Sequence, residues 1–138
     1  MIFVDTGAWI ALTDQSDQYH REAIQIYNHL KKQRVRFLTT DYVIDETVTR
    51  IRYDANHHLA LQFLDILNLS EKSDILQIVY TDEAIFREAI SLFRHYDSVV
   101  LSLTDCVSFT ICKTYKIHQA FAFDQDFLMM GIALCQDK

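Results

Sequence analysis

The stretch Ile2-Phe3-Val4-Asp5 decides how this chain folds, because an acidic residue follows an apolar run without any spacer. Three consecutive apolar residues are typical of a short strand that is buried on both faces of a sheet. In an α/β sheet, ligands gather at the carboxyl ends of the parallel strands, so an acid in this position points into the cleft. Asp5 is therefore the first candidate for a functional residue.

Three further acids lie in comparable settings along the chain. Asp124 directly follows the apolar run Ala120-Phe121-Ala122-Phe123, and Asp105 opens a stretch with helical spacing. Glu46 lies within a helical pattern, away from the apolar stripe formed by Ile44, Val48 and Ile51. Several acids that converge at one edge of a sheet indicate a site for a divalent metal ion.

Apolar periodicity predicts strands that alternate with helices. The predicted strands cover residues 2–4, 35–39, 75–80 and 120–123, and the predicted helices cover residues 19–32, 41–54, 56–69, 83–94, 102–115 and 126–130. Residues 70–74 form the clearest predicted loop, and the helices on either side of residue 55 are expected to form a hairpin or a bent pair. The alternation predicts an α/β fold with a mostly parallel sheet and helices on both faces.

The composition favours one compact domain. The chain has 138 residues, of which 50% are hydrophobic and 23% charged, with no proline and two glycines. The cysteines Cys106, Cys112 and Cys135 are odd in number and lie among apolar neighbours, which predicts buried thiols. Without a secretory signal or an apolar span of roughly 20 residues, we expect a cytoplasmic protein with no membrane segment.

The charge balance argues against generic affinity for nucleic acids. The formal net charge is −6, whereas sequence-independent binding normally needs a basic surface. However, metal ions bound by clustered acids would neutralise much of this charge, and the basic residues are grouped. These groups are Lys31, Lys32, Arg34 and Arg36; Arg50 and Arg52; and Lys113 and Lys116.

Four segments together resemble the PIN-domain nucleases over the whole length of the chain. They are Phe-Val-Asp-Thr-Gly-Ala-Trp at 3–9, Ile-Asp-Glu-Thr-Val at 44–48, Ser-Leu-Thr-Asp-Cys-Val-Ser-Phe at 102–109 and Ala-Phe-Asp-Gln-Asp-Phe at 122–127. The resemblance implies a single PIN-like domain over residues 1–138, built as a three-layer sandwich. Its central, mostly parallel sheet would have four to five strands flanked by helices.

The same resemblance implies an active site at the carboxyl edge of the sheet that holds Mg²⁺ or Mn²⁺. The positions that match the family's catalytic and metal-binding acids are Asp5, Glu46, Asp105 and Asp124. Thr6 matches a small hydroxyl residue that hydrogen-bonds inside the acidic cluster. Asp126 could take the place of Asp124 or act together with it. In the same way, but less strongly, Asp45 is an alternative to its neighbour Glu46.

Hydrolysis of a phosphodiester bond needs such acids for reasons that are independent of any family. A hard cation held by oxygen ligands can activate water near neutral pH and stabilise the negative charge of the transition state. Mg²⁺ keeps several waters, so three or four carboxylates suffice. We assign Asp5, Asp105 and Asp124 to metal binding, and Glu46 to metal binding or to orienting the attacking water.

Each of these residues also has an ordinary structural explanation. Asp5 or Thr6 could cap the first helix, Ser102 and Asp105 have the spacing of a capping box, and Asp124 could cap the last helix. Glu46 could be a solvated helix residue. Arg50 and Arg52 are candidates for RNA phosphate contacts, although a solvated helix face explains them equally well.

The family resemblance implies a metal-dependent endoribonuclease with the build of a VapC-type toxin from a toxin–antitoxin pair. Similar toxins form homodimers and are blocked by an antitoxin that covers the cleft. Two alternatives remain open: a PIN ribonuclease of RNA processing without an antitoxin, and a non-catalytic interaction domain. A phosphatase or a structure-specific DNA nuclease could also use such a cluster of acids.

Overall fold

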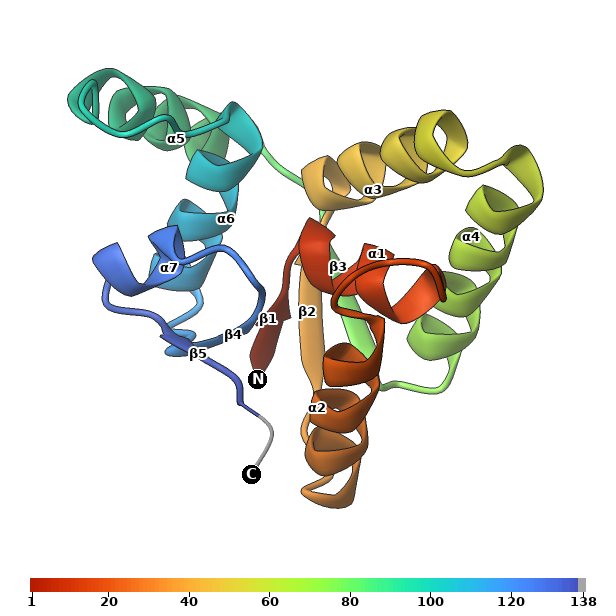
Figure 1. Cartoon of the computed structure of the whole chain (residues 1–138). Helices are drawn as coiled ribbons and strands as arrows, with labels where there is room; N and C mark the ends of the chain where they lie inside the picture. The colour runs from red at the N-terminus through yellow and green to blue at the C-terminus, as the bar shows by residue number, and fades with distance from the viewer. Residues whose placement is uncertain (137–138) are drawn as a thin grey trace.

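The computed structural model describes residues 1–136 and contains a five-stranded sheet between two groups of helices (Figure 1). The strands are β1 (Ile2–Val4), β2 (Phe37–Thr40), β3 (Leu76–Val79), β4 (Gln119–Phe121) and β5 (Ala133–Leu134). The helices are α1 (Thr6–Thr13), α2 (His20–Lys32), α3 (Asp41–Asp54), α4 (His57–Lys72), α5 (Glu83–His95), α6 (Leu103–Thr114) and α7 (Asp126–Met129).

All strand pairs are parallel, which confirms the predicted α/β sandwich. The strand order is β3-β2-β1-β4-β5, and Phe3 pairs with Leu38 on one side and with Ala120 on the other. Since parallel crossovers are right-handed, connections that run toward β3 and those that run toward β5 put their helices on opposite faces. Figure 1 shows α1 to α4 on one face and α5 to α7 on the other.

The core forms around β1, whose three residues are all buried. On one face, Trp9 of α1 packs edge-on against Phe63 of α4 at a ring separation of 5.6 Å, and its indole N–H donates a hydrogen bond to Thr39 Oγ1 at 3.4 Å. On the other face, Phe127 packs against Phe109 at 5.0 Å. The helix α1 was not among the predicted elements, because its segment is apolar on nearly every side and lacks an amphipathic period.

Three helices end at a residue in the left-handed conformation that is not glycine. Arg34, Asp74 and Lys116 have φ values of 55°, 59° and 55°, and follow α2, α4 and α6. After α4, the Ile75 N–H donates to Ser70 O at 3.0 Å and the Asp74 N–H donates to Glu71 O at 3.1 Å, which is a Schellman motif. The predicted loop at 70–74 is therefore wrong in its first part, because α4 continues to Lys72.

The buried row of α3 differs from the predicted stripe. Val43, Thr47 and Ile51 are buried, whereas Ile44 and Val48 are only half-buried. This rotation places Glu46 beside the buried row instead of opposite to it, which brings its carboxylate toward the sheet edge. Of the two predicted arrangements, the bent pair is the one observed: α3 and α4 contact each other and meet at an angle (Figure 1).

The three cysteines are free and buried, as predicted. Within residues 1–136, no helix has both the length and the apolar character that a membrane crossing requires.

Candidate active site

Asp5 lies at the junction between β1 and α1, where its backbone is fixed on both sides. Its N–H donates to Phe121 O at 3.0 Å, and its carbonyl accepts from the N–H groups of Ala8 and Trp9 at 3.1 Å. Asp5 is the N-cap residue of α1 by backbone position, but its side chain makes no capping hydrogen bond. The expectation that the Asp5 carboxylate caps the first helix is therefore wrong, and the carboxylate lies buried at the carboxyl edge of the sheet.

Asp105 has a structural role that uses only one of its oxygen atoms. Ser102 Oγ accepts from the Asp105 N–H at 3.0 Å, and Asp105 Oδ2 accepts from the Ser102 N–H at 3.0 Å. This capping box confirms the pattern seen in the sequence. The second carboxylate oxygen of Asp105 has no hydrogen-bond partner within residues 1–136 and is open to a ligand.

Asp124 and Asp126 lie in one turn after β4. Asp124 Oδ1 accepts from the Asp126 N–H at 2.9 Å, so the Asp124 carboxylate holds this turn. Burial and the negative charge of Asp124 raise the pKa of Asp126. The structure thus keeps both acids at this end of the sheet, with Asp124 in the turn that follows β4 and Asp126 as the first residue of α7.

Glu46 and its neighbour Asp45 are separated by the geometry of α3. Asp45 is exposed and accepts a hydrogen bond from the Thr49 hydroxyl at 3.4 Å. Glu46 is half-buried, and its charge acts on both Asp5 and Asp105. The structure therefore brings Glu46, and not Asp45, to the other acids.

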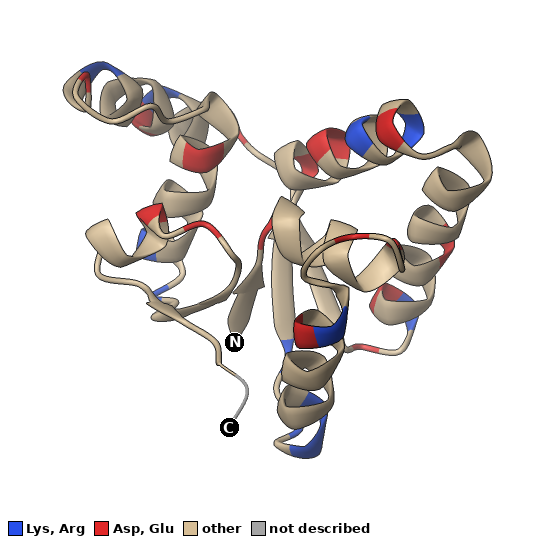
Figure 2. Cartoon of the chain, in the orientation of Figure 1, with Lys and Arg blue, Asp and Glu red and all other residues tan. Residues whose placement is uncertain are grey.

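The four acids repel one another electrostatically. The pKa of Asp5 is raised to about 7, mainly by burial and also by the charges of Asp105, Glu46 and Asp124, while a hydrogen bond from the backbone of Thr6 opposes the shift. Burial likewise raises the pKa of Asp105, with Asp124 and Glu46 adding to the effect and hydrogen bonds from Ser102 opposing it. We name Asp5, Glu46, Asp105 and Asp124 the acid cluster. Figure 2 shows the acidic segments that follow β1 and that lie in α3 and α6 toward the same end of the sheet.

Two buried hydroxyl groups lack a hydrogen-bond partner, and each follows a residue of the acid cluster in sequence. Thr6 Oγ1 follows Asp5, and Thr47 Oγ1 follows Glu46. The predicted hydrogen bond of Thr6 inside the cluster is absent from the part of the chain that the structure describes. A buried hydroxyl without a partner costs about 1–3 kcal/mol, so Thr6 leaves an unmet donor and acceptor directly beside the most deeply buried carboxylate.

The acid cluster has suitable ligand atoms for a divalent cation but is not a closed cage. Among residues 1–136, no group of three or more His, Cys, Asp or Glu side chains is drawn together tightly enough to hold an ion by itself. Carboxylate oxygens are the ligands that Mg²⁺ and Mn²⁺ prefer, and Mg²⁺ keeps several of its waters when it binds protein. Together with the unpartnered Thr6 hydroxyl, the donor set fits a hydrated cation bound through one or two carboxylates and water.

The family model of the PIN domain matches residues 2–132, nearly the whole chain. The chain belongs to the PIN-domain family. This confirms the resemblance that the four sequence segments indicate, and the elements that supply Asp5, Glu46, Asp105 and Asp124 all lie inside the matched range.

Characterised relatives of this PIN-domain chain are VapC ribonucleases. A 23S rRNA-specific endonuclease, VapC20 of Mycobacterium tuberculosis, is 28% identical over 131 residues, which is 95% of each chain. A VapC ribonuclease of Archaeoglobus fulgidus is 27% identical over 132 residues, covering 94% of this chain and 80% of the relative.

Solved structures show the same fold. The crystal structure of VapC20, described as a toxin that cleaves the sarcin–ricin loop, matches with a TM-score of 0.85 at 27% identity, covering 96% of this chain and 97% of that chain. VapBC2 of Rickettsia felis, solved with a DNA fragment from its promoter, matches with a TM-score of 0.66 at 12% identity over 97% of both chains. The second likeness concerns the fold alone.

The two arginines of α3 that were candidates for phosphate contacts are both exposed. Arg52 Nη1 lies 3.0 Å from His57 Nδ1, across the turn between α3 and α4. Arg50 forms no ion pair within residues 1–136. Both are free to approach a polyanion, and a solvated helix face remains an equally good explanation.

Sequence reasoning missed Thr47 as a residue adjoining the site. Its position in the buried row of α3 follows from the rotation of that helix, and the predicted stripe pointed to Ile44 and Val48 instead. A polar residue among apolar ones at helical spacing was the only signal that could have identified it.

Proposed function

We propose that this protein is an endoribonuclease that hydrolyses phosphodiester bonds in RNA with the aid of Mg²⁺ or Mn²⁺. The observation that carries the proposal is the acid cluster, in which one buried and three half-buried carboxylates lie together without an ion pair to a basic residue within residues 1–136. Such an arrangement is electrostatically costly in the metal-free protein and is typical of functional sites. Its position at the carboxyl edge of a parallel sheet, in a chain related to ribonucleases, supports the same reading.

In this proposal, Asp5, Asp105 and Asp124 hold the cation, and Glu46 binds it or orients the attacking water. Asp105 is suited to its role because Ser102 fixes its carboxylate and leaves one oxygen open. Asp5 is partly protonated near neutral pH when no cation is bound, since its pKa is about 7. Its carboxyl group therefore releases that proton when a cation binds.

The remaining residues of the site have supporting roles. A divalent cation, when present, supplies charge stabilisation and a more acidic bound water. The Thr6 hydroxyl, which has no partner within residues 1–136, would donate a hydrogen bond to a cation-bound water, and Asp126 supports the turn that carries Asp124. Arg50 and Arg52 contact RNA phosphates from the outer surface of α3.

We further propose that the protein acts in the cytoplasm as the toxin of a toxin–antitoxin pair. The relatives named VapC and the match of the PIN-domain model to residues 2–132 support this assignment, and we propose that residues 1–138 form a single PIN-like domain. An antitoxin would cover the acid cluster, and the toxin would form a homodimer. Co-expression with the neighbouring gene followed by purification tests the partner, and a lack of association would leave only the ribonuclease assignment.

The decisive experiment is cleavage of a defined RNA by the purified protein. The sarcin–ricin stem-loop of 23S rRNA is the first substrate to use, because the relative VapC20 cuts that loop; a scrambled stem-loop and a DNA copy are the comparison substrates. We expect cleavage of RNA with Mg²⁺ or Mn²⁺, and none with EDTA.

Matched variants assign the cleavage to the acid cluster. Asp5→Asn/Asp105→Asn should abolish cutting, whereas Asp65→Asn, which changes an exposed acid on α4, should cut like the wild type. Equal cutting by the folded double variant would show that the acid cluster is not the active site. Cutting of DNA in preference to RNA would overturn the substrate class.

A further inference from the structure

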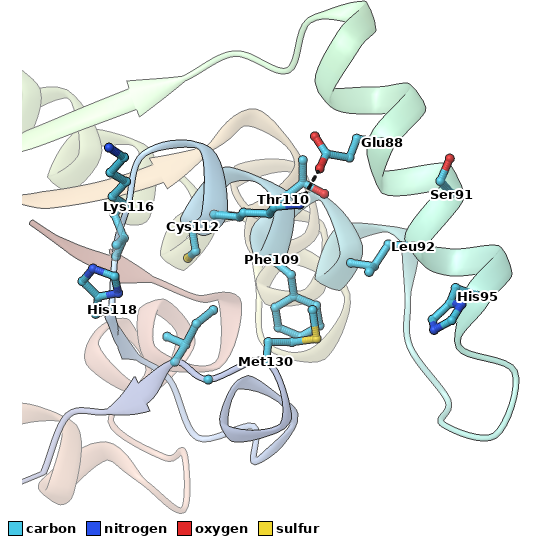
Figure 3. A pocket seen from close by; sticks show the side chains of 14 residues that line it. Glu88, Ser91, Leu92, His95, Phe109, Thr110, Cys112, Lys116, His118 and Met130 are labelled. Atoms are coloured by element: carbon cyan, nitrogen blue, oxygen red, sulfur yellow. Dashed lines mark hydrogen bonds and ion pairs between the residues drawn. The ribbon is translucent and has the colours of Figure 1, made fainter.

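A cavity of about 640 Å³ lies outside the acid cluster, between α5, the second half of α6 and the turn from α7 to β5 (Figure 3). Pockets of this size commonly hold ligands as large as a nucleotide. None of the four cluster acids lines the cavity. We name it the α5–α6–α7 pocket.

The pocket lies at the far ends of two helices that begin at the acid cluster. Asp105 lies in the first turn of α6 and Lys113 in its last turn, so the helix spans roughly 12 Å between them. Asp126 is the first residue of α7, and Met130, which follows that helix, lines the pocket. Along the helix axis, Met130 lies roughly 6 Å from Asp126. A nucleic-acid strand lying on the cluster would therefore reach the pocket within a few nucleotides.

The floor of the pocket is apolar. Leu92 of α5, Phe109 of α6 and Met130 after α7 face the hollow from three different elements (Figure 3). Phe109 is held in place because its ring packs edge-on against Phe127. Apolar and aromatic surfaces of this kind accept the face of an unstacked base, which is the part of single-stranded RNA that proteins bind most readily.

The rim of the pocket is basic on a chain whose net charge is −6. Lys113, Lys116 and His118 lie on it, and the acid on the rim, Glu88, is paired with Lys113 at 3.4 Å. Lys116 forms no ion pair with any residue between 1 and 136. Cations after the last turn also stabilise a helix end, which explains the charges of the two lysines but not the apolar hollow beside them.

We propose that the α5–α6–α7 pocket receives a nucleotide of the RNA strand that flanks the scissile phosphate, with the base against the half-buried Leu92 and Met130, above the buried ring of Phe109, and the phosphate at Lys116. This inference rests on the proposed ribonuclease function and adds a determinant of substrate choice to it. The combination of an apolar floor with a basic rim matches a base and its phosphate together.

The test compares two single lysine substitutions that remove the same charge. Lys116→Asn removes the pocket cation without straining the backbone, because asparagine tolerates the left-handed φ of 55° at this position. Lys72→Asn, at the end of α4, is the matched control far from the pocket. A second pocket variant, Ser91→Trp, fills the hollow from an exposed position on α5 and leaves the charge unchanged.

The readouts are the KM and kcat for RNA cleavage and the affinity for labelled single-stranded RNA in EDTA over a series of salt concentrations. For Lys116→Asn we expect a roughly threefold to tenfold weaker affinity, with a salt slope smaller by about one, and a raised KM at unchanged kcat. Ser91→Trp should raise KM as well, and Lys72→Asn should behave like the wild type.

Three outcomes would overturn the proposal. If the wild type cuts RNA and both pocket variants match Lys72→Asn in KM and affinity, the pocket is not an RNA site, although the ribonuclease function stands. If the wild type neither binds nor cuts RNA, both proposals fail. If the pocket variants lose only the binding of an acidic antitoxin segment, the pocket is a protein-docking site.

Discussion

The charged residues at the amino edge of the sheet are arranged differently from those at the carboxyl edge. At the amino edge, Arg36 and Asp74 form an exposed ion pair at 2.8 Å, and lysines in the last turns of α2 and α4 lie next to the negative helix ends. At the carboxyl edge, Asp5 and three other acids lie together with no ion pair to a cation within residues 1–136.

The difference teaches how to separate structural charges from functional ones. The charges of the amino edge are exposed, and each is either paired, as in Arg36 and Asp74, or placed where a helix end favours it, so folding alone explains them. At the carboxyl edge, Asp5 is buried, the other three acids are half-buried, and all four repel one another, which lowers the stability of the metal-free fold. Natural sequences keep such costly arrangements chiefly at functional sites.

The strongest test of this comparison is the pH dependence of stability in EDTA. The pKa of Asp5 is raised from 3.8 to about 7, so its contribution to stability is complete below pH 3.8 and is lost as the pH rises through about 7. The difference corresponds to about 4 kcal/mol of unfolding free energy, as an order of magnitude. Chemical denaturation across this range should show the loss in the wild type and in Asp74→Asn, and a clearly smaller loss in Asp5→Asn, in which the raised pKa of Asp105 remains. An equal pH dependence in all three proteins would contradict the account.

The second test adds a divalent cation. A ligand that binds only the folded state at 100 times its Kd raises the unfolding free energy by about 2.7 kcal/mol. We expect Mg²⁺ or Mn²⁺ to raise the Tm of the wild type more at pH 8 than at pH 5, because protons compete with the cation for Asp5. Asp105→Asn should reduce the shift, whereas Asp74→Asn should keep it. Identical shifts in the two variants would place the cation elsewhere.

The third test compares the two buried hydroxyl groups near the carboxyl edge, those of Thr6 and Thr47. Replacing either by valine removes a buried polar group without a partner, so Thr6→Val and Thr47→Val should each raise the unfolding free energy by about 1 kcal/mol. Only Thr6→Val should also lower kcat for RNA cleavage, because Thr6 adjoins Asp5 whereas Thr47 lies in the core-facing row of α3. A loss of stability in Thr6→Val would show that its hydroxyl is satisfied in solution.

The smallest effect is expected at the amino edge. Arg36→Gln breaks an ion pair whose side chains are 49% and 87% exposed, and such pairs contribute about 0.2–1 kcal/mol. Thermal denaturation should therefore shift only slightly, and RNA cleavage should be unchanged. A strong effect on cleavage would mean that the amino edge also takes part in function.

Helix starts were more predictable from the sequence than helix ends. Ser102 and Asp105 form the capping box that their spacing predicts, and α3 has the predicted bounds because Thr40 caps it through a bond from the Val43 N–H. The usual sequence signal for a helix end is a glycine in the left-handed conformation. The end of α4 lacks this signal, because Asp74 adopts that conformation instead.

Two elements lay beyond sequence patterns for different physical reasons. The segment of α1 is apolar on nearly all sides, so no amphipathic period distinguishes it from a buried loop. The strand β5, at Ala133–Leu134, is too short to show an alternation and exists only because it pairs with β4.

The acid cluster was predictable in its members and not in its geometry. Asp5 and Asp124 follow apolar strands, which fixes their edge of the sheet. The position of Glu46 depends on the rotation of α3, which is set by the packing of Val43 and Thr47 and not by the helical period alone. The α5–α6–α7 pocket could not be predicted, because its lining comes from elements that meet only in the fold.

The most direct test of the central claim is an NMR titration of the Asp5 carboxyl group with and without Mg²⁺. The claim is that buried, mutually repelling carboxylates at the carboxyl edge form a site for a divalent cation. In EDTA the account predicts a pKa of about 7 for Asp5, and with saturating Mg²⁺ a fall toward the value of an ordinary aspartate. A pKa near 3.8 in EDTA, or a raised pKa that Mg²⁺ does not change, would contradict it.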